Sequence, residues 1–331
     1  MIPLSKNKID SFCRIFDVPE FVTPWLHRFF EIQEIELVLD LADQKDNPSR
    51  DTDFLNRCNR RGLISFDADG NPLLADFHVR YDIWALFEGW QDVPDEIRIK
   101  LNRWELASYV ARKRLVIEES LKTGRRDRTH PWSEFALLDE ALAMIDRVPH
   151  IYQWPCNCRA MMKGCLKPEY VCLRFTNDRN LGWEISKTRA KEILRHAHQK
   201  GLIHNVGLSL LADGSIDGGI CNCCSDCCYD HQLASELGIK PFWPINRYVA
   251  SYSEGLCSAC GRCSKRCPYH AFTMAKKQPG GDQPPVKVTL FDSNLCRGCG
   301  LCVSTCPEKA IEMKSLEPSP LSIMDDLLKA N

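Results

Sequence analysis

The chain has 331 residues, of which 44% are hydrophobic and 26% charged, and its formal net charge is −1. This length fits two or three domains of ordinary soluble composition. No run of 18 apolar residues is present, which excludes a transmembrane helix. The near-zero charge gives no global attraction to nucleic acid or anionic membrane. The first twenty residues lack the pattern of a secretory signal, so we expect a cytoplasmic protein.

Residues 1–125 are expected to be mostly helical. Apolar residues recur at helical spacing from Phe30 to Leu41, and Asp53 is a candidate cap for a helix that ends at Gly62. The segment 64–77 then predicts two short strands around an Asp-Gly turn, and a long helix is expected from about residue 94 to 121. Helix followed by hairpin is the order of a winged-helix unit. We therefore interpret residues 1–125 as a helical, winged-helix-like docking domain.

The polar, basic stretch at 122–131 marks a domain boundary, so residues 126–250 form a predicted middle domain. Helices are expected there from Ser133 to Arg147 and from a Ser186 cap to a stop at Gly201. Gly-Leu-Ile followed by Leu-Leu-Ala-Asp occurs within both 62–76 and 201–213. This similarity reflects either two winged-helix-like units or coincidence.

Nineteen cysteines in a chain of this size suggest metal binding, whereas in a secreted mini-protein they would suggest disulfides. Seventeen of them lie after residue 155. The two earlier ones, Cys13 and Cys58, are interpreted as ordinary buried thiols.

Two cysteine runs near the C-terminus share the spacing Cys-x2-Cys-x2-Cys-x3-Cys-Pro. A cubane cluster needs one thiolate per iron, and in paired runs the fourth cysteine of each run serves the other cluster. One predicted ligand set is Cys257, Cys260, Cys263 and Cys306. The other is Cys296, Cys299, Cys302 and Cys267. A pair of zinc sites is the weaker alternative, because both runs end in Cys-Pro.

With these motifs, residues 251–316 resemble the bacterial 2[4Fe–4S] ferredoxin family. The residues after each proline repeat as well, and each is expected to continue as a short helix and strand related by a pseudo-twofold axis. The resemblance implies two [4Fe–4S] clusters of low potential that exchange single electrons. A Gly/Pro-rich insertion from Lys276 to Lys287 departs from the family, and residues 317–331 form a tail.

Nine further cysteines form two groups without the regular ferredoxin spacing. We predict one cluster on the first group and a second on four members of the second group, although mixed ligation is equally allowed. The alternatives are structural zinc or a redox-switch thiol cluster. Adjacent cysteines could point to opposite sides and serve two centres. The first group is Cys156, Cys158, Cys165 and Cys172, and the second is Cys221, Cys223, Cys224, Cys227 and Cys228.

Polar residues near these groups offer further contacts. Arg159 could donate hydrogen bonds to cluster sulfur or lie on the surface. Packed or solvated side chains are expected for four histidines, although a histidine ligand would raise a cluster's potential. These are His196, His198, His204 and His231. The segments 156–159 and 220–228, upstream of the ferredoxin motifs, resemble multi-cluster ferredoxin-domain proteins of anaerobic bacteria.

The predicted fold class is α+β, with a helical N-terminal region, a cysteine-rich middle domain and a ferredoxin-like module. The sequence holds no dinucleotide, flavin or P-loop motif. We expect a multi-cluster electron-transfer protein serving a ferredoxin, hydrogenase or reductase subunit. One alternative is an oxidoreductase whose middle cluster binds substrate. Another is a redox sensor with a DNA-binding winged helix, using Asn59, Arg60 and Arg61, which the net charge disfavours.

Overall fold

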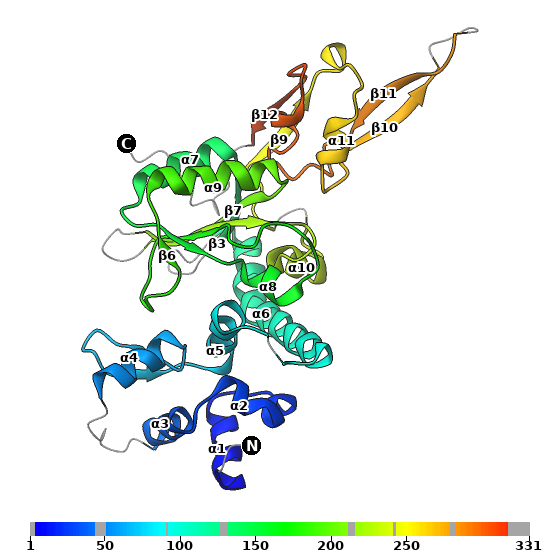
Figure 1. The fold of residues 1–331 in the computed structure, drawn as a ribbon. Coiled ribbons are helices and arrows are strands. Elements are labelled where there is room, and N and C mark those ends of the chain that lie inside the picture. The colour runs from blue at the N-terminus through cyan, green and yellow to red at the C-terminus, as the bar shows by residue number, and fades with distance from the viewer. Residues whose placement is uncertain are drawn as a thin grey trace. The chain divides into compact units, whose positions relative to one another are not determined.

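A computed structural model describes residues 4–43, 51–90, 92–125, 132–210, 216–240, 243–278 and 283–316 (Figure 1). The chain forms two compact units. Unit 1 comprises residues 1–107 with two short segments, 160–162 and 177–181, and unit 2 comprises the remaining residues. The division falls inside helix α6 (Asp95–Thr123). The presence of this helix confirms the long helix predicted from the sequence. Helices and strands are mixed in the described chain, and the predicted domain limits at 125, 250 and 316 stay predictions.

Unit 1 is a small helical assembly around an aromatic core. Phe29 packs edge-on against Phe77, and Phe12 packs edge-on against Phe30. These rings are almost completely buried, so their apolar area drives the packing of the short helices. Besides the first part of α6, its helices are α1 (Lys6–Ile15), η1 (Glu20–Trp25), α2 (Leu26–Phe29), α3 (Ile32–Ala42), α4 (Thr52–Arg60), α5 (Phe77–Ile83) and η2 (Trp84–Glu88).

A β-hairpin follows α4, as predicted. Strands β1 (Ile64–Phe66) and β2 (Pro72–Leu74) pair antiparallel, with the expected Asp-Gly turn between them. The predicted helix cap is wrong by two residues: Asp51 precedes α4, and its carboxylate accepts from the backbone N–H of Asp53. Helix and hairpin thus occur in the predicted order, and the winged-helix assignment stays a prediction.

Unit 2 contains a six-stranded antiparallel sheet with the order β3-β7-β8-β5-β4-β6. Helices α7 (Leu138–Arg147) and α9 (Lys187–Gln199) pack together against β7 (Figure 1). The side chain of Ser186 accepts from the N–H of Arg189 and caps α9, as predicted. The strands are β3 (Trp132–Ala136), β4 (Tyr152–Trp154), β5 (Cys172–Arg174), β6 (Trp183–Glu184), β7 (Ile203–Leu210) and β8 (Ile216–Cys223).

The helix predicted from Ser133 is wrong over its first residues. Residues 132–136 form β3, in which Phe135 pairs with Asn205 of β7, and the helix begins only at Leu138. The apolar spacing from Phe135 onward resembled a helix, but pairing with β7 satisfies the backbone of this segment. Gly-Leu-Ile at 62–64 and at 201–203 links a helix to a strand in both places. Residues 211–213 of the possible repeat lie outside the described residues.

The ferredoxin-like segment of unit 2 forms two antiparallel strand pairs. Strand β9 (Tyr248–Tyr252) pairs with β12 (Ile311–Ser315), and β10 (Phe272–Lys277) pairs with β11 (Val286–Phe291). The strands predicted after the two Cys-Pro pairs are β10 and β12. The insertion extends the β10–β11 hairpin, of which 279–282 lie outside the described residues, as does the tail from 317. Short helices accompany the strands: η3 (Glu254–Leu256), α11 (Arg262–Arg266) and η4 (Val303–Thr305).

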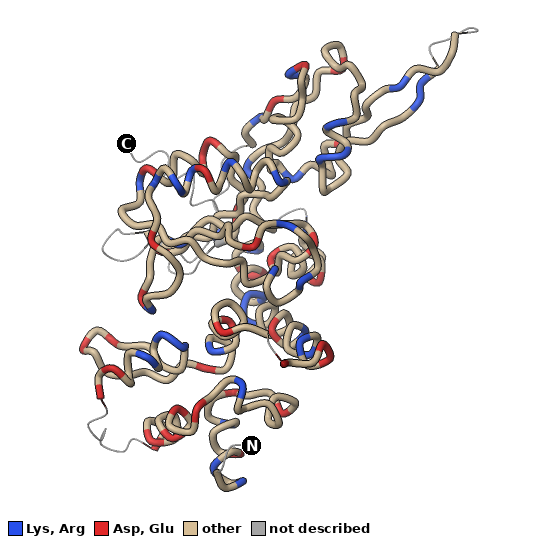
Figure 2. Tube along the Cα trace, viewed as in Figure 1, with Lys and Arg blue, Asp and Glu red and all other residues tan. Residues whose placement is uncertain are grey.

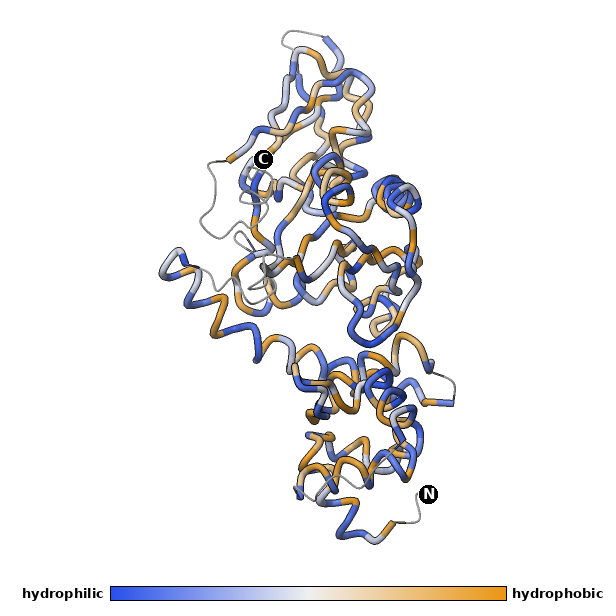
Figure 3. The backbone as a smooth tube through the Cα atoms, turned by 90° about the vertical axis from the view of Figure 1, so that its left-hand side faces the viewer, coloured by the Kyte–Doolittle hydropathy of each residue, from blue (hydrophilic) through white to orange (hydrophobic). Residues whose placement is uncertain are grey.

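Hydrophobic and hydrophilic stretches alternate along the described chain (Figure 3). Among the described residues, no helix has the length and apolar character that crossing a membrane requires.

Candidate metal centres

The first predicted ligand set surrounds one cavity. Cys257, Cys260, Cys263 and Cys306 all line it, together with Tyr252 and Thr289. The first three thiols come from the loop before and the first turns of α11, and the fourth comes from the end of η4. This cavity therefore combines three cysteines of the first motif with the fourth cysteine of the second motif.

The second set surrounds a matching cavity. Its four cysteines, Cys267, Cys296, Cys299 and Cys302, line this space with apolar neighbours that include Phe272 and Leu301. Burial raises the pKa of the Cys299 thiol to about 12, because no water stabilises its anion there. Iron binding must displace that proton, so loading of this site depends on pH.

The backbone of the two motifs repeats with an offset of 39 residues. Ala259 and Gly298 hold equivalent left-handed positions, with φ of 51° and 65°, and Gly261 and Gly300 both have φ of 74°. Such turns direct backbone N–H groups toward an anion. The N–H of Ala259 lies 3.3 Å from the Cys257 sulfur. The N–H groups of Ala250 and Ala310 lie 3.3 Å from Cys296 Sγ and 3.2 Å from Cys306 Sγ. The donor set and its hydrogen bonds fit thiolate-bound iron.

Six of the nine middle cysteines form a closed ring, which we call the thiol ring. Each thiol interacts electrostatically with the next, and the sulfurs of Cys223 and Cys228 lie within hydrogen-bond distance, 3.3 Å apart. The ring unites both cysteine groups of the sequence, which is the mixed arrangement that the spacing left open. In order around the ring, its members are Cys156, Cys158, Cys228, Cys223, Cys221 and Cys172.

Secondary structure explains how these thiols meet. Cys221 and Cys223 alternate with Asn222 in β8, so both project from the same face of the strand. Cys228 is the N-cap of α10 (Tyr229–Glu236), and Cys156 is the N-cap of α8 (Asn157–Met162). Hydrogen bonds from Cys172 and Cys223 lower the pKa of the Cys221 thiol to about 5. The neighbouring ring thiols and burial raise the pKa of Cys158 and Cys223 instead. A soft metal that binds the ring would therefore displace protons.

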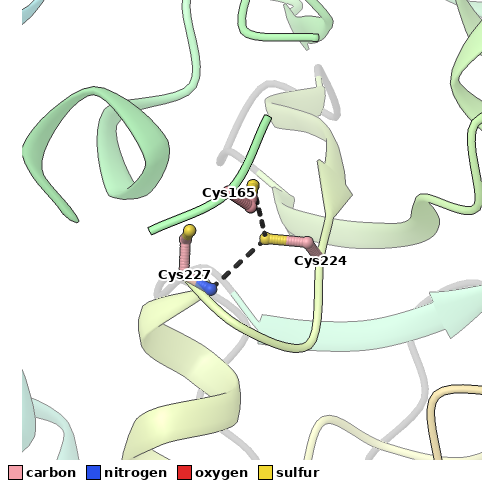
Figure 4. Close-up of side chains that lie close together, drawn as sticks. All are labelled: Cys165, Cys224 and Cys227. Carbon is pink, nitrogen blue, oxygen red and sulfur yellow. Dashed lines mark hydrogen bonds between the residues drawn. The ribbon is translucent and has the colours of Figure 1, made fainter. Parts of the chain in front are cut away.

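The other three middle cysteines form a second group, the cysteine triad (Figure 4). The sulfurs of Cys165, Cys224 and Cys227 all lie within 4.8 Å of one another. Cys165 and Cys224 are 3.8 Å apart, and the N–H of Cys227 donates to Cys224 at 3.3 Å. Hydrogen bonding by Cys227 is the main cause that lowers the pKa of Cys224 to about 4.

The adjacent cysteine pairs divide between these two groups. Cys223 joins the ring and Cys224 the triad, while Cys227 joins the triad and Cys228 the ring. Cys165, predicted to act with Cys156, Cys158 and Cys172, lies instead with the second group of the sequence. This division matches the idea that adjacent cysteines serve two centres.

Arg159 lies between the ring and the triad. Its side chain is 4% exposed, so the alternative of a surface arginine is wrong. Its guanidinium donates to the carbonyl oxygens of Asn222, at 2.6 Å, and Pro168. Burial alone would lower the pKa of Arg159, but the nearby thiols of Cys156, Cys172 and Cys224 raise it. A permanently charged group thus offsets thiolate charge at both sites.

Two of the four candidate histidines are buried in a hydrogen-bonded chain. His204 contacts Asn222 at 2.7 Å and His198 at 3.3 Å, and His198 contacts Ser304 at 2.8 Å. His196 is exposed, and His231 packs edge-on against Phe135. Among the described residues, no histidine belongs to a group of three close metal-ligand atoms. The expectation of packed or solvated histidines agrees with these positions.

A cleft of about 490 Å³ lies beside the second ferredoxin cavity. Tyr269 and Arg297 line both this cleft and the cavity of Cys299. His231, Trp243 and Lys240 line the cleft from the other side. Sequence reasoning named His231 but missed the other four residues. The only available signal was that Tyr269 and Arg297 adjoin the cysteine motifs.

Residues 256–310 match the family model of the 4Fe–4S dicluster domain. No curated protein and no solved structure matches the chain. The match and the two cysteine-lined cavities define an iron–sulfur protein with a ferredoxin-type domain. Its chemistry is therefore electron transfer or redox catalysis.

Proposed function

We propose that this chain is a multi-cluster electron-transfer protein. It passes low-potential electrons between a donor and a redox enzyme, of which a ferredoxin, a hydrogenase or a reductase subunit are candidates. Iron–sulfur clusters supply one-electron transfer when bound. The two ferredoxin ligand sets would hold one [4Fe–4S] cluster each, and the thiol ring would hold a further iron–sulfur centre.

The packing between the ferredoxin segment and the sheet carries this proposal. Cys299 and Leu301 share a buried apolar cluster with Ile203 and Phe135. Ile203 is the strand partner of Cys223, a member of the thiol ring. A ligand of the second ferredoxin site is thus separated from the ring by one paired strand. Close, dry contact between successive redox sites is what an electron pathway requires.

The protein groups around the sulfurs tune the sites. Backbone N–H donors and nearby guanidinium groups stabilise negative charge on a reduced cluster, which raises its potential. Arg266 and Arg297 both act electrostatically on Cys299. The first cavity is lined by Arg262 and Glu308, and there Glu308 acts on Cys257. We therefore propose that the second site has the higher potential, so that electrons flow from the first site toward the thiol ring.

Metal analysis of anaerobically purified protein tests this function. Eight irons per chain are expected from the ferredoxin sites, and about twelve or more if the ring also holds a cluster. Reduced protein should show spin-coupled EPR signals. The Cys260→Ala and Cys299→Ala variants should each lose one ferredoxin cluster, while Cys223→Ala should lose only the ring signal. A count of eight irons that is unaffected by Cys223→Ala would contradict the proposed pathway.

The cleft favours a second candidate, an oxidoreductase that reduces a small substrate. It lies beside a predicted cluster ligand set, has the volume of a ligand site and combines aromatic walls with cationic Arg297 and Lys240. These features suit a small anionic acceptor. The test is turnover by the full protein with an artificial electron donor and a panel of corrinoid, disulfide and carboxylic acid acceptors. Substrate turnover that Tyr269→Phe and Lys240→Ala reduce at unchanged iron content would favour catalysis over electron carriage.

The DNA-binding alternative relied on Asn59, Arg60 and Arg61 and on seven Lys and Arg residues between Arg112 and Arg128. Two of these residues, Arg61 and Asn59, make contacts inside unit 1. The side chain of Arg61 pairs with Glu31 and Glu34 at 3.0 Å, and Asn59 binds Arg179 within unit 1. Lys and Arg are interspersed with Asp and Glu along the described chain (Figure 2). These contacts support a structural role for Arg61 and Asn59.

A further inference from the structure

The cysteine triad differs in spacing from the ferredoxin sites. Its three sulfurs lie within 4.8 Å of one another, and no other three histidine, cysteine or carboxylate groups in the described residues do so. No three of the eight ferredoxin sulfurs, all of which belong to described residues, lie this close to one another. That wider spacing suits a cube, because each thiolate points away from a different iron.

The triad spacing suits a single ion. Two thiolates bound to one tetrahedral zinc ion at about 2.3 Å lie roughly 3.8 Å apart. The Cys165 and Cys224 sulfurs are separated by 3.8 Å. Cys224 and Cys227 have the Cys-x2-Cys spacing of zinc-binding turns, and the N–H of Cys227 already donates to Cys224 Sγ.

We propose that Cys165, Cys224 and Cys227 bind one Zn²⁺ ion, with a fourth coordination position left for an external ligand such as water. This site is separate from the iron–sulfur centres. It does not share sulfur with the thiol ring, because the adjacent cysteines of both pairs project into different groups.

The charge of the surroundings agrees with this assignment. Three thiolates and one Zn²⁺ ion carry a net charge of −1, and Arg159 places a buried positive charge beside Cys224. The same arginine acts on Cys156 and Cys172 of the ring. It therefore allows two anionic metal sites to stand close together, since an uncompensated buried charge would be costly.

The exposure of the triad is uneven: Cys224 and Cys227 are buried, and Cys165 is half-buried. Among the described residues, no further histidine, cysteine or carboxylate joins the three sulfurs. Cys165 is half-buried in the segment between α8 and β5, next to the fully exposed Leu166. Zinc sites with three protein ligands and an accessible fourth position act as Lewis acids in enzymes, whereas closed four-thiolate sites are structural.

X-ray absorption at the zinc edge, on full-length protein purified anaerobically, tests the site directly. We expect about one zinc per chain, with three sulfur neighbours at about 2.3 Å and one lighter neighbour. Four sulfur neighbours would overturn the open position. A chain without zinc would overturn the site itself, whatever its iron content, so this test is independent of the proposed electron-transfer function.

Serine variants assign the ligands. Cys165→Ser and Cys227→Ser should each lower the zinc content at least tenfold at unchanged iron content. Cys13→Ser, which alters a half-buried thiol of unit 1, should retain both metals. Cys221→Ser should lower iron and leave zinc unchanged. Loss of iron from the Cys165→Ser or Cys227→Ser variant, or full zinc retention in both, would refute the assignment.

Discussion

At the scale of single residues, buried polar side chains join segments that are distant in the sequence. His204 of β7 contacts Asn222 of β8 and His198 of α9, and His198 reaches Ser304 in the ferredoxin segment. At one end of this hydrogen-bonded series, Asn222 lies between the ring cysteines Cys221 and Cys223 in the sequence. At the other end, Ser304 lies two residues after Cys302. The series holds the ferredoxin segment and the ring in register.

We predict that His204 makes stability dependent on pH. Burial, with a smaller contribution from His198, lowers its pKa to about 4, whereas an unfolded histidine titrates near 6.5. The unfolded state therefore binds more protons between pH 6.5 and 4, and stability is lost as the pH falls through this window. From pH 7.5 to 5.5 the loss from His204 is about 1 kcal/mol.

Anaerobic urea unfolding at these two pH values measures this effect. His204→Gln should unfold with a smaller pH dependence than the parent protein. The exposed His196→Gln variant is the matched control and should keep the full dependence. Equal pH dependence in the parent protein and His204→Gln would refute the prediction.

Arg80 is a second buried charge, inside unit 1. Its side chain is fully buried, donates to the carbonyl of Phe29 at 2.8 Å and binds Glu88 through two bonds of 2.8 and 2.6 Å. We predict that Arg80→Met destabilises unit 1 by roughly 3–5 kcal/mol, because these acceptors lose their partner. Lys100→Met, which removes a surface pair with Glu96, should cost less than about 1 kcal/mol. Similar losses of unfolding free energy in both variants would contradict this difference.

At the scale of elements, short turns fix the position of each cysteine. The two ferredoxin motifs use left-handed residues at matching places, but their surroundings differ. A Cβ atom at Gly298 would meet Asn246 Oδ1 and the Tyr248 carbonyl at 2.2 Å. At Gly261 the nearest atoms belong to the flexible Met274 side chain, at 3.6 Å.

We predict that Gly298→Ala disrupts the second ferredoxin site, because the backbone carbonyl of Tyr248 cannot move without disturbing β9. The variant should lose about four irons per chain and one of the two ferredoxin EPR signals. Gly261→Ala carries a similar left-handed strain without the clash, so it should retain both signals. The prediction fails if both variants retain the same iron content.

At the scale of the whole molecule, the candidate metal ligands lie in one compact unit. All seventeen cysteines after residue 155 belong to unit 2, whereas Cys13 and Cys58 belong to unit 1. Unit 1 has its own aromatic core. The two units are therefore expected to unfold as separate transitions.

Removal of iron and zinc by a chelator under reducing conditions should affect only one of these transitions. We predict that the unit 2 transition shifts to lower temperature in differential scanning calorimetry, since metal binding contributes directly to folding there. The unit 1 transition should stay in place. The Arg80→Met variant identifies the unit 1 transition, and an equal shift of both transitions on metal removal would contradict the prediction.

The ferredoxin segment follows from local features of the sequence. The spacing of its eight cysteines is local, because each short gap limits how three thiols can wrap one cluster. It predicted both ligand sets, and the structure brings each set around one cavity. Local signals also located α9 through its Ser186 cap and the β1–β2 hairpin through its Asp-Gly turn, since caps and turns depend on neighbouring residues.

The grouping of the middle cysteines depends on tertiary contacts. Cys165 and Cys224 are 59 residues apart, and no local rule brings them within 3.8 Å. Strand pairing contributes to this contact, because β5, which follows Cys165 in the chain, lies beside β8, which immediately precedes Cys224. The strand at 132–136 was missed for the same reason: its partner, β7, lies far along the chain. Long-range pairing thus determined which thiols form the ring and which form the triad.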